Sequence, residues 1–286
     1  MIKKVEIDGS GGFCGGVIRA IGSAEDFLGS HPGTTLYSLG PVVHNESELE
    51  RLSSLGLEAV SAVELEQIGG AGRPVIIRAH GEAPETLEKL RRLGYEIIDC
   101  TCPVVLGIQR KIAAAPGDVI IYGKKGHPEV IGLVGNARGR VWVVENMDQA
   151  RELLALDDGP TADADIFSQT TMSPVGYEEV CGLLAGGLPG LRIHRTICRQ
   201  VATRHDALAA FARSHDAVVF VTGKASSNGR VLSDLCRSVN PRTYVVGSVA
   251  DINPSWFRPG DTIGVSGATS TPRWLLEKVV EYISDF

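Results

Sequence analysis

The chain has 286 residues, of which 43% are hydrophobic and 22% are charged, and its formal net charge is −6. This composition excludes a disordered chain, and the negative charge argues against nonspecific binding to nucleic acid or to acidic membranes. No apolar run approaches the roughly 18 residues of a spanning helix, and the first six residues lack the apolar stretch of a signal peptide, so we expect a cytoplasmic protein without membrane segments.

Predicted helices and strands alternate along the chain. A helix is expected over residues 17–28, where apolar residues recur at helical spacing. Short β-branched runs, each ending in glycine or polar residues, predict buried strands at residues 75–77, 119–122 and 217–221. Helical patterns at 85–93 and 231–239 separate such runs. The sequence therefore predicts an α/β fold with parallel sheets.

Three cysteines occur at nearly equal spacing along the chain: Cys14, Cys102 and Cys198. This spacing suggests three similar α/β units, although no strict sequence repeat is present. We predict units at residues 14–99, 100–196 and 197–286, with residues 1–13 packing on the third.

Each of these three cysteines precedes a predicted helix. Cys14 lies in a glycine-rich segment, Cys102 precedes Pro103, and Cys198 precedes a segment that continues to residue 212. The positive end of a helix dipole favours the thiolate, which is the form that binds metal. The alternative is that each is a small buried apolar residue.

The remaining cysteines differ in their surroundings. Cys181 and Cys236 fall within helical patterns and are expected in the core, whereas Cys100 is two residues from Cys102 and its spacing allows a fourth ligand. Disulfides are not expected in a reducing compartment. Structural zinc usually uses close Cys-x-x-Cys pairs, which this sequence lacks, so three separated thiolates suit an iron–sulfur cluster with one open iron better.

Three histidines follow or adjoin strand ends in glycine-rich segments: His44, His80 and His127. Imidazoles that converge there would bind an oxyanion. For the other four histidines we expect structural roles, namely His31, His194, His205 and His215.

Hydroxyl and amide side chains add further anion donors. Ser226, Ser227 and Asn228 precede the helix at 231–239, where they would form either an anion site or an ordinary helix cap. Residues 168–171, which include Thr170, and residues 266–270, which include Ser270, offer similar donors after strands.

Glu129 is the one carboxylate among these segments. In an extended stretch over residues 127–129, Glu129 would face the same side as His127 and could deliver protons. The alternative is a first-turn glutamate that a helix dipole stabilises.

Together, these segments resemble the LytB family of 4-hydroxy-3-methylbut-2-enyl diphosphate reductases over the whole chain. The matching segments are residues 12–17, 19–21, 43–45, 78–81, 101–103, 126–130, 169–171, 197–198, 226–228 and 270.

The resemblance implies three α/β units with pseudo-threefold symmetry around a central [4Fe-4S] cluster that has one open iron site. It implies Cys14, Cys102 and Cys198 as ligands, Glu129 as the proton source and Thr170 near the substrate hydroxyl. The implied diphosphate-binding residues are His44, His80, His127, Ser226, Ser227, Asn228 and Ser270. The implied reaction is reductive dehydroxylation of the substrate to isopentenyl and dimethylallyl diphosphate. No nicotinamide fingerprint is present, so electrons would come from an external donor such as ferredoxin or flavodoxin.

The chain departs from the family pattern at three positions. Glu46 follows His44-Asn45 where a proline is usual, Cys100 replaces a small residue and is therefore not expected to be a ligand, and Arg199 follows Cys198. These changes keep a second hypothesis open, a divergent member that reduces a related allylic or diphosphate substrate. A third, a cluster-binding redox sensor without catalysis, would leave Glu129 and the anion donors without a purpose.

Overall fold

The computed structural model describes residues 2–286. Packing divides it into two compact units, here called the first and second units. The first unit contains the residues up to Thr35, Pro41–Glu58 and Gln200–Phe286, and the second contains Leu36–Gly40 and Ala59–Arg199. None of the helices formed by residues 2–286 combines the length and the apolar character that crossing a lipid bilayer would require.

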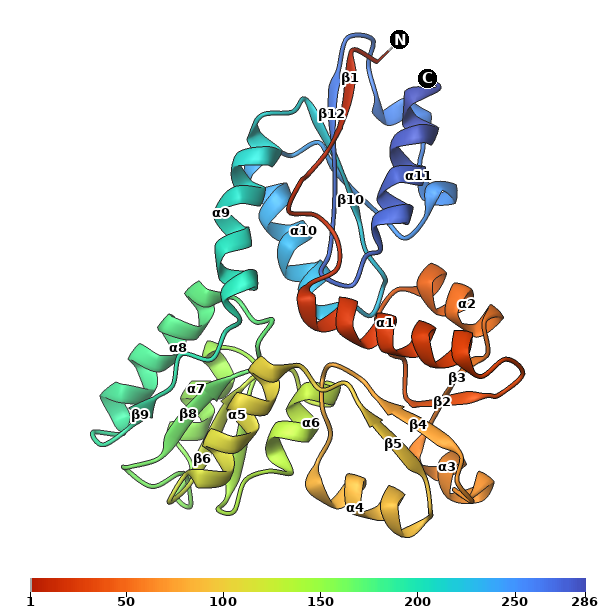
Figure 1. Ribbon diagram of the computed structural model, residues 1–286. Coiled ribbons are helices and arrows are strands. Elements are labelled where there is room, and N and C mark those ends of the chain that lie inside the picture. Colours follow the sequence, from red (N-terminus) through yellow and green to blue (C-terminus); the bar gives the residue numbers. More distant parts are fainter. Residues whose placement is uncertain (1) are drawn as a thin grey trace. The chain divides into compact units, whose positions relative to one another are not determined.

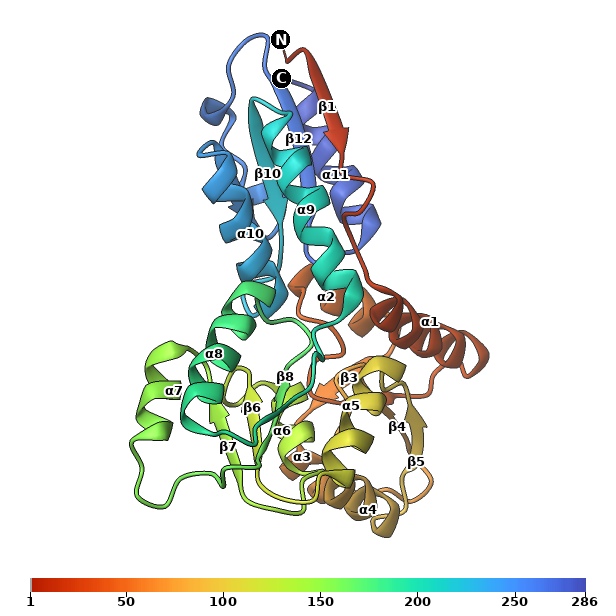
Figure 2. The same cartoon turned by 90° about the vertical axis from the view of Figure 1, so that its left-hand side faces the viewer.

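The sheet of the first unit has the strand order β1-β12-β10-β11, and its neighbouring strands run parallel. Its strands are β1 (Lys4–Ile7), β10 (Ala217–Val221), β11 (Thr243–Val246) and β12 (Thr262–Gly267). Its helices are α1 (Gly15–Ser30), α2 (Glu46–Ser54), α9 (Arg199–Arg213), α10 (Ser227–Val239) and α11 (Arg273–Ser284), with the short 3-10 helices η1 (Val249–Asp251) and η2 (Pro254–Trp256). Figures 1 and 2 show β1 beside β12, so the two ends of the chain share one sheet.

Helices cover both faces of this sheet, and the sequence of β10 explains why. Val218 and Phe220 pack with apolar residues of α9 and α10, whereas Val219 and Val221 pack with those of α11. Successive side chains of a strand point to opposite faces, so a strand that is apolar throughout needs a cover on each side.

Two further sheets are centred in the second unit. The first has the order β3-β2-β4-β5, and Val75 and Ile77 of β4 pack against Leu65 of α3 and Leu90 of α4. Its elements are β2 (Leu36–Leu39), β3 (Leu57–Val60), α3 (Ala62–Ile68), β4 (Pro74–Ile77), α4 (Pro84–Arg92) and β5 (Glu96–Asp99).

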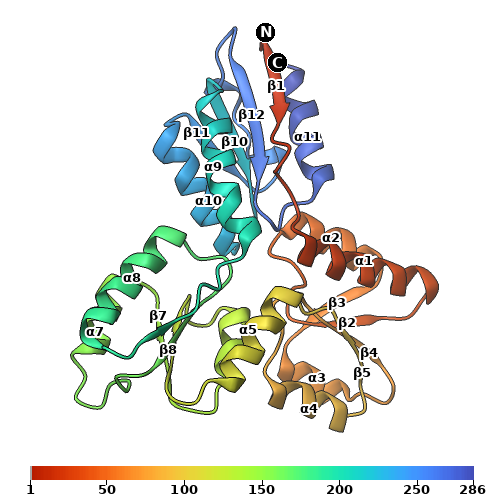
Figure 3. The same ribbon diagram turned by 60° about the vertical axis from the view of Figure 1, so that its left-hand side comes forward.

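The other sheet of the second unit has the order β7-β6-β8-β9. Its elements are α5 (Pro103–Ala114), β6 (Val119–Tyr122), α6 (Pro128–Val134), β7 (Val141–Val144), α7 (Met147–Leu154), β8 (Asp165–Ser168), α8 (Pro174–Gly187) and β9 (Arg192–Ile193). Ile121 and Phe167 pack with α5 and α6, and Ile120 and Ile166 pack with α7 and α8, so this sheet too is covered on both faces (Figure 3).

The predicted α/β class is confirmed, because the described chain forms three four-stranded sheets whose neighbouring strands are parallel. The predicted strands at 119–122 and 217–221 coincide with β6 and β10, and that at 75–77 lies within β4. The unit boundaries predicted at 14–99, 100–196 and 197–286 stay a prediction.

Candidate functional site

Four side chains that we predicted to bind an anion lie at the carboxyl end of the sheet in the first unit and are here called the anion cradle: Ser226, Ser227, Asn228 and Ser270. β10 and β12 are adjacent and parallel, so the segments that follow them meet at one edge of the sheet. Ser226 is the N-cap of α10, and its Oγ accepts a hydrogen bond from the Gly229 amide at 3.0 Å. The Ser270 hydroxyl, which comes from the segment after β12, lies 3.0 Å from the same Oγ. The predicted serines are therefore brought together.

Asn228 links the segment after β10 to the segment after β12, and its Nδ2 donor stays unpaired. Its Oδ1 accepts hydrogen bonds from the amide and the hydroxyl of Thr269, each at 3.0 Å. Among the residues that the structure describes, neither Asn228 Nδ2 nor Ser227 Oγ has a hydrogen-bond partner, although both residues are 4% exposed. Buried donors are nearly always paired, so two unpaired donors at a helix N-terminus indicate a ligand with acceptor oxygens.

His44 belongs to the same unit. It precedes Asn45, whose side chain caps α2 by accepting the Glu48 amide at 3.0 Å. The backbone of His44 runs against Gly223, the second residue after β10. A Cβ at Gly223 would lie 2.3 Å from the His44 carbonyl oxygen, so only glycine allows this approach.

Cys14 is the N-cap of α1, as predicted for a thiol at a helix start. Its amide donates to the Thr269 carbonyl at 3.2 Å, which ties the cysteine segment to the anion cradle. Cys14 also lines a cavity of about 520 Å³ together with Gly12, Thr269 and Arg204.

The second unit holds the other two candidate cysteines at helix starts. Cys102 is the N-cap of α5, and its amide donates to the Ala79 carbonyl at 3.0 Å. Cys198 directly precedes α9, and its amide donates to the Thr170 carbonyl at 3.0 Å. Both cysteines are half-buried and neither is in a disulfide.

The other three cysteines are buried, which confirms the core positions predicted for Cys181 and Cys236. Burial raises the pKa of the Cys181 thiol to about 11 and that of Cys236 to about 12. Thiols of this kind stay protonated and unreactive. Cys100 is 2% exposed, whereas Cys102 two residues later is half-buried, and this difference sets the two thiols apart.

Glu129 does not lie in an extended segment, so that part of the prediction is wrong. Pro128 is the first residue of α6, where its fixed φ suits a helix, and Glu129 therefore lies in the first helical turn. The side chain is nevertheless 1% exposed and contacts Thr170: Oε1 accepts the Thr170 amide at 2.7 Å, and Oε2 accepts the Thr170 hydroxyl at 2.8 Å. The first-turn alternative is confirmed, and the role of Glu129 in proton delivery stays a prediction.

Burial makes the Glu129 carboxyl a weaker acid than an exposed glutamate. Desolvation raises the pKa of Glu129 to about 7, and the two hydrogen bonds from Thr170 offset part of that rise. A carboxyl with a pKa near neutrality can both hold and release a proton under physiological conditions.

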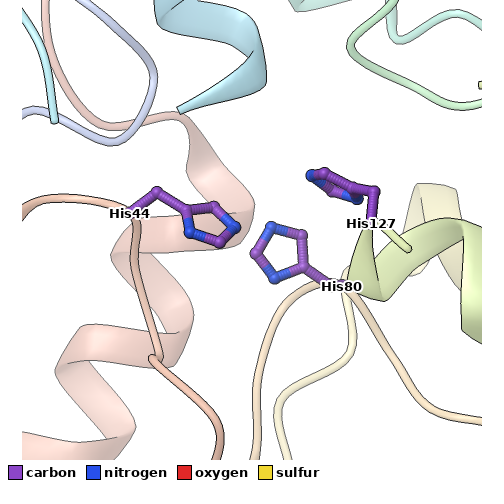
Figure 4. Close-up of side chains that lie close together, drawn as sticks. All are labelled: His44, His80 and His127. Atoms are coloured by element: carbon purple, nitrogen blue, oxygen red, sulfur yellow. The ribbon is translucent and has the colours of Figure 1, made fainter. Parts of the chain in front are cut away.

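His127 caps the helix that carries Glu129. Its Nδ1 accepts the Glu129 amide at 3.2 Å, so in the neutral ring the proton resides on Nε2, which can then donate to a ligand. The His80 ring stands edge to face against it, with ring centroids 5.3 Å apart (Figure 4). Cys102 is tied to Ala79, the neighbour of His80, and so the same backbone contact positions both residues.

The structure assigns local partners to three of the four histidines for which we predicted structural roles. The His31 ring stacks on Phe27, His194 lies 2.7 Å from an Asp165 oxygen, and His215 lies 3.2 Å from a Glu6 oxygen. His205 is different: burial lowers its pKa, and its Nε2 has no hydrogen-bond partner in the described chain.

Arg204 is a further buried residue near Cys14 that the sequence motifs did not predict. Arg204 is 5% exposed and lies on the apolar face of α9 together with Val201 and Leu208. The sequence offers one indication of this burial, since Arg204 stands at helical spacing between apolar residues. A charged residue on an apolar helix face is rarely buried without a purpose.

Comparison with known proteins agrees with these features. Residues 5–284 match the family described as LytB protein. The chain belongs to the LytB family. It is 44% identical over 293 residues to a protein of Parabacteroides distasonis named 4-hydroxy-3-methylbut-2-enyl diphosphate reductase, covering 99% of this chain and 98% of that relative. A protein of the same name from Bacteroides fragilis is 42% identical over 290 residues, covering 98% of this chain and 97% of that relative.

A solved structure also matches nearly the whole chain. It is described as (E)-4-hydroxy-3-methyl-but-2-enyl diphosphate reductase, the terminal enzyme of the non-mevalonate pathway. The TM-score is 0.73 at 33% sequence identity, and the match covers 99% of each chain. The LytB resemblance stated from the sequence is thereby confirmed.

Proposed function

We propose that this protein is a 4-hydroxy-3-methylbut-2-enyl diphosphate reductase, which converts its substrate to isopentenyl and dimethylallyl diphosphate. The reaction consumes two electrons and two protons and releases one water molecule. The observation that carries the proposal is Glu129, a buried carboxyl with a pKa raised to about 7, hydrogen-bonded to Thr170. Thr170 also accepts the Cys198 amide, so Glu129 lies next to the segment of a candidate cluster ligand. A reductive loss of water requires both a proton source and an electron source.

Cys14, Cys102 and Cys198 fit an iron–sulfur cluster by the chemistry of their thiols. Each lies at the start of a helix, each is half-buried, and none is in a disulfide. The helix dipoles favour the thiolates, which suits cluster iron. When bound, a [4Fe-4S] cluster with one open iron supplies electrons and a Lewis acid. In the proposed arrangement, each of the three predicted units contributes one cysteine.

The anion cradle would hold the diphosphate. Ser227 Oγ and Asn228 Nδ2 have no other partner in the described chain, and Ser226 and Ser270 offer hydroxyls beside them. The N-terminus of α10 adds its dipole. His44, His80 and His127 would contribute further donors, with His127 donating from Nε2. Such contacts orient the allylic end of the substrate without taking part in its chemistry.

Glu129 would supply protons from its buried position. Thr170 holds both carboxyl oxygens and would also contact the substrate hydroxyl, so a proton on Glu129 has a short path to the leaving oxygen. Burial keeps bulk water away from this carboxyl, which limits wasteful proton exchange. The electrons would come from an external ferredoxin or flavodoxin, because the sequence carries no nicotinamide fingerprint.

Anaerobic purification followed by iron and sulfide analysis tests the cluster. We expect four iron atoms per chain in the wild type, a marked loss in Cys14→Ser, Cys102→Ser and Cys198→Ser, and no loss in the matched control Cys100→Ser. Oxidation of a reduced viologen dye on addition of hydroxymethylbutenyl diphosphate then tests turnover. A loaded protein that does not oxidise the dye would contradict the proposed substrate.

Glu46 favours a second candidate, a reductase for a related allylic diphosphate. Its Oε1 accepts the Lys224 amide at 3.3 Å, which places a carboxylate beside the segment that leads to Ser226. A negative charge there would alter how an anionic substrate is held. Growth of cells that lack the pathway enzyme separates the two: rescue supports the pathway reductase, and no rescue by a loaded protein favours the second candidate.

A further inference from the structure

Arg204 clamps the segment that carries Cys14. It is buried on α9, and its guanidinium donates from Nη1 to the Gly12 carbonyl at 3.4 Å and from Nη2 to the Gly267 carbonyl. Gly12 lies two residues before Cys14, and Gly267 lies two residues before Thr269. Because the Cys14 amide bonds to Thr269, the guanidinium and this amide hold the same two segments together.

The planar guanidinium suits this task better than an ammonium would. Its donors form a fixed fork that can bind two acceptors at once, and it remains charged even when buried. Gly12 has a φ of +111°, which glycine adopts without strain and other residues rarely adopt. Because glycine leaves the backbone conformationally free, the bond from Arg204 to the Gly12 carbonyl restricts the segment that leads to Cys14.

The guanidinium of Arg204 forms no salt bridge within residues 2–286. The carboxylate whose charge acts on it is that of Asp8, which also accepts hydrogen bonds from the hydroxyls of Ser10 and Ser266. The Nε donor has no hydrogen-bond partner among the described residues. Arg204 and Cys14 line the same cavity. A buried cation with a spare donor is costly unless an anion lies close to it.

We propose that Arg204 positions Cys14 and, through its buried positive charge, raises the reduction potential of the iron–sulfur cluster that Cys14 binds. Reduction adds negative charge to a cluster, and a nearby cation stabilises the reduced form. This inference rests on the proposed function, because it assumes that Cys14 is a cluster ligand. It assigns Arg204 a role in electron transfer into the site, in addition to its contribution to the fold.

Three variants test the proposal in anaerobically prepared holoenzyme by redox titration monitored with electron paramagnetic resonance. Arg204→Gln removes the charge, and we expect at least a tenfold lower ratio of reduced to oxidised cluster at fixed potential, which is about 59 mV for one electron. Arg204→Lys keeps the charge and should restore the potential while losing iron faster, because an ammonium lacks the two-carbonyl fork. Arg213→Gln removes an exposed arginine from the end of the same helix and should leave the potential unchanged.

A purely structural role would give a different result. If Arg204→Gln lost cluster content while its remaining cluster kept the wild-type potential, the proposal would be overturned. If Arg204→Gln holds no cluster at all, a second measurement tests whether Arg204 lies close to the cluster. It is pulsed electron paramagnetic resonance of the reduced wild type grown with ¹⁵N-arginine, which detects coupling between the cluster and an arginine nitrogen. A nitrogen coupling that persists in Arg199→Gln and disappears in Arg204→Lys supports the proposal, and no coupling overturns it.

Failure of this inference is distinguishable from failure of the proposed function. A wild-type protein without a cluster, or with a cluster and no turnover, contradicts the function. A wild type that turns over substrate, together with an Arg204→Gln variant of unchanged potential, contradicts only the role of Arg204.

Discussion

Replacing Glu129 with glutamine should nearly abolish turnover while leaving the fold intact. The glutamine is isosteric, and its Oε1 can still accept the Thr170 amide that now bonds at 2.7 Å. The Thr170 hydroxyl can turn to accept from the new amide instead of donating at 2.8 Å. A positioned general acid contributes about 10²–10⁴-fold to a rate, so we expect kcat to fall by that factor.

The pH dependence follows from the same carboxyl. Desolvation raises the pKa of Glu129 from 4.5 to about 7, which at about 1.4 kcal/mol per unit corresponds to roughly 3 kcal/mol. The folded pKa lies above the unfolded one, so stability from the neutral carboxyl is full below pH 4.5 and is lost as pH rises through about 7. The same titration removes the proton donor, and wild-type kcat should fall above pH 7.

Viologen oxidation measured from pH 5.5 to 9, with thermal unfolding at the same pH values, tests this reasoning. Glu129→Gln should lose the decline in unfolding temperature between pH 5.5 and about 7, and it should lose the alkaline limb of its residual activity. The exposed Glu152→Gln is the matched control and should behave like the wild type. A Glu129→Gln variant with wild-type kcat, or a wild-type profile that is flat through pH 7, would refute the role of Glu129.

Three further perturbations address the neighbouring residues. Thr170→Val removes a hydrogen bond that lowers the pKa of Glu129, so the alkaline limb should move to higher pH in the same assay, whereas Thr170→Ser should leave it in place. Asn228→Asp keeps the acceptor for Thr269, loses the unused Nδ2 donor and adds a negative charge beside the proposed diphosphate site. KM for the diphosphate should therefore rise at least roughly 5- to 150-fold, for a loss of about 1–3 kcal/mol or more. Gly229→Ala places a Cβ 1.9 Å from Thr222 Oγ1 and should reduce stability by about 1–3 kcal/mol in urea unfolding, with partial recovery in the Thr222→Ala double variant. An unchanged KM in Asn228→Asp would contradict the proposed contact between Asn228 and the diphosphate. A fully stable Gly229→Ala would contradict the packing at the start of α10.

The sequence by itself determined the class of the fold and the segments of the site. The apolar, largely β-branched run at 217–221 predicted a buried strand, and β10 is such a strand, covered on both faces. The starts of α1 and α5 at Cys14 and Cys102 follow from glycine-rich and proline punctuation, which acts over a few residues. The motif order was enough to indicate the LytB family.

Only the tertiary structure decided what each site residue contacts. The sequence could not show that Glu129, in a first helical turn, would be buried against Thr170, because that contact joins segments 41 residues apart. The unused donors of Ser227 and Asn228, and the clamp from Arg204 to Gly12, likewise depend on which strands are neighbours. Local propensity acts over one or two turns, whereas burial, the pKa of a carboxyl and the pairing of a donor are set by chain segments that meet only after folding.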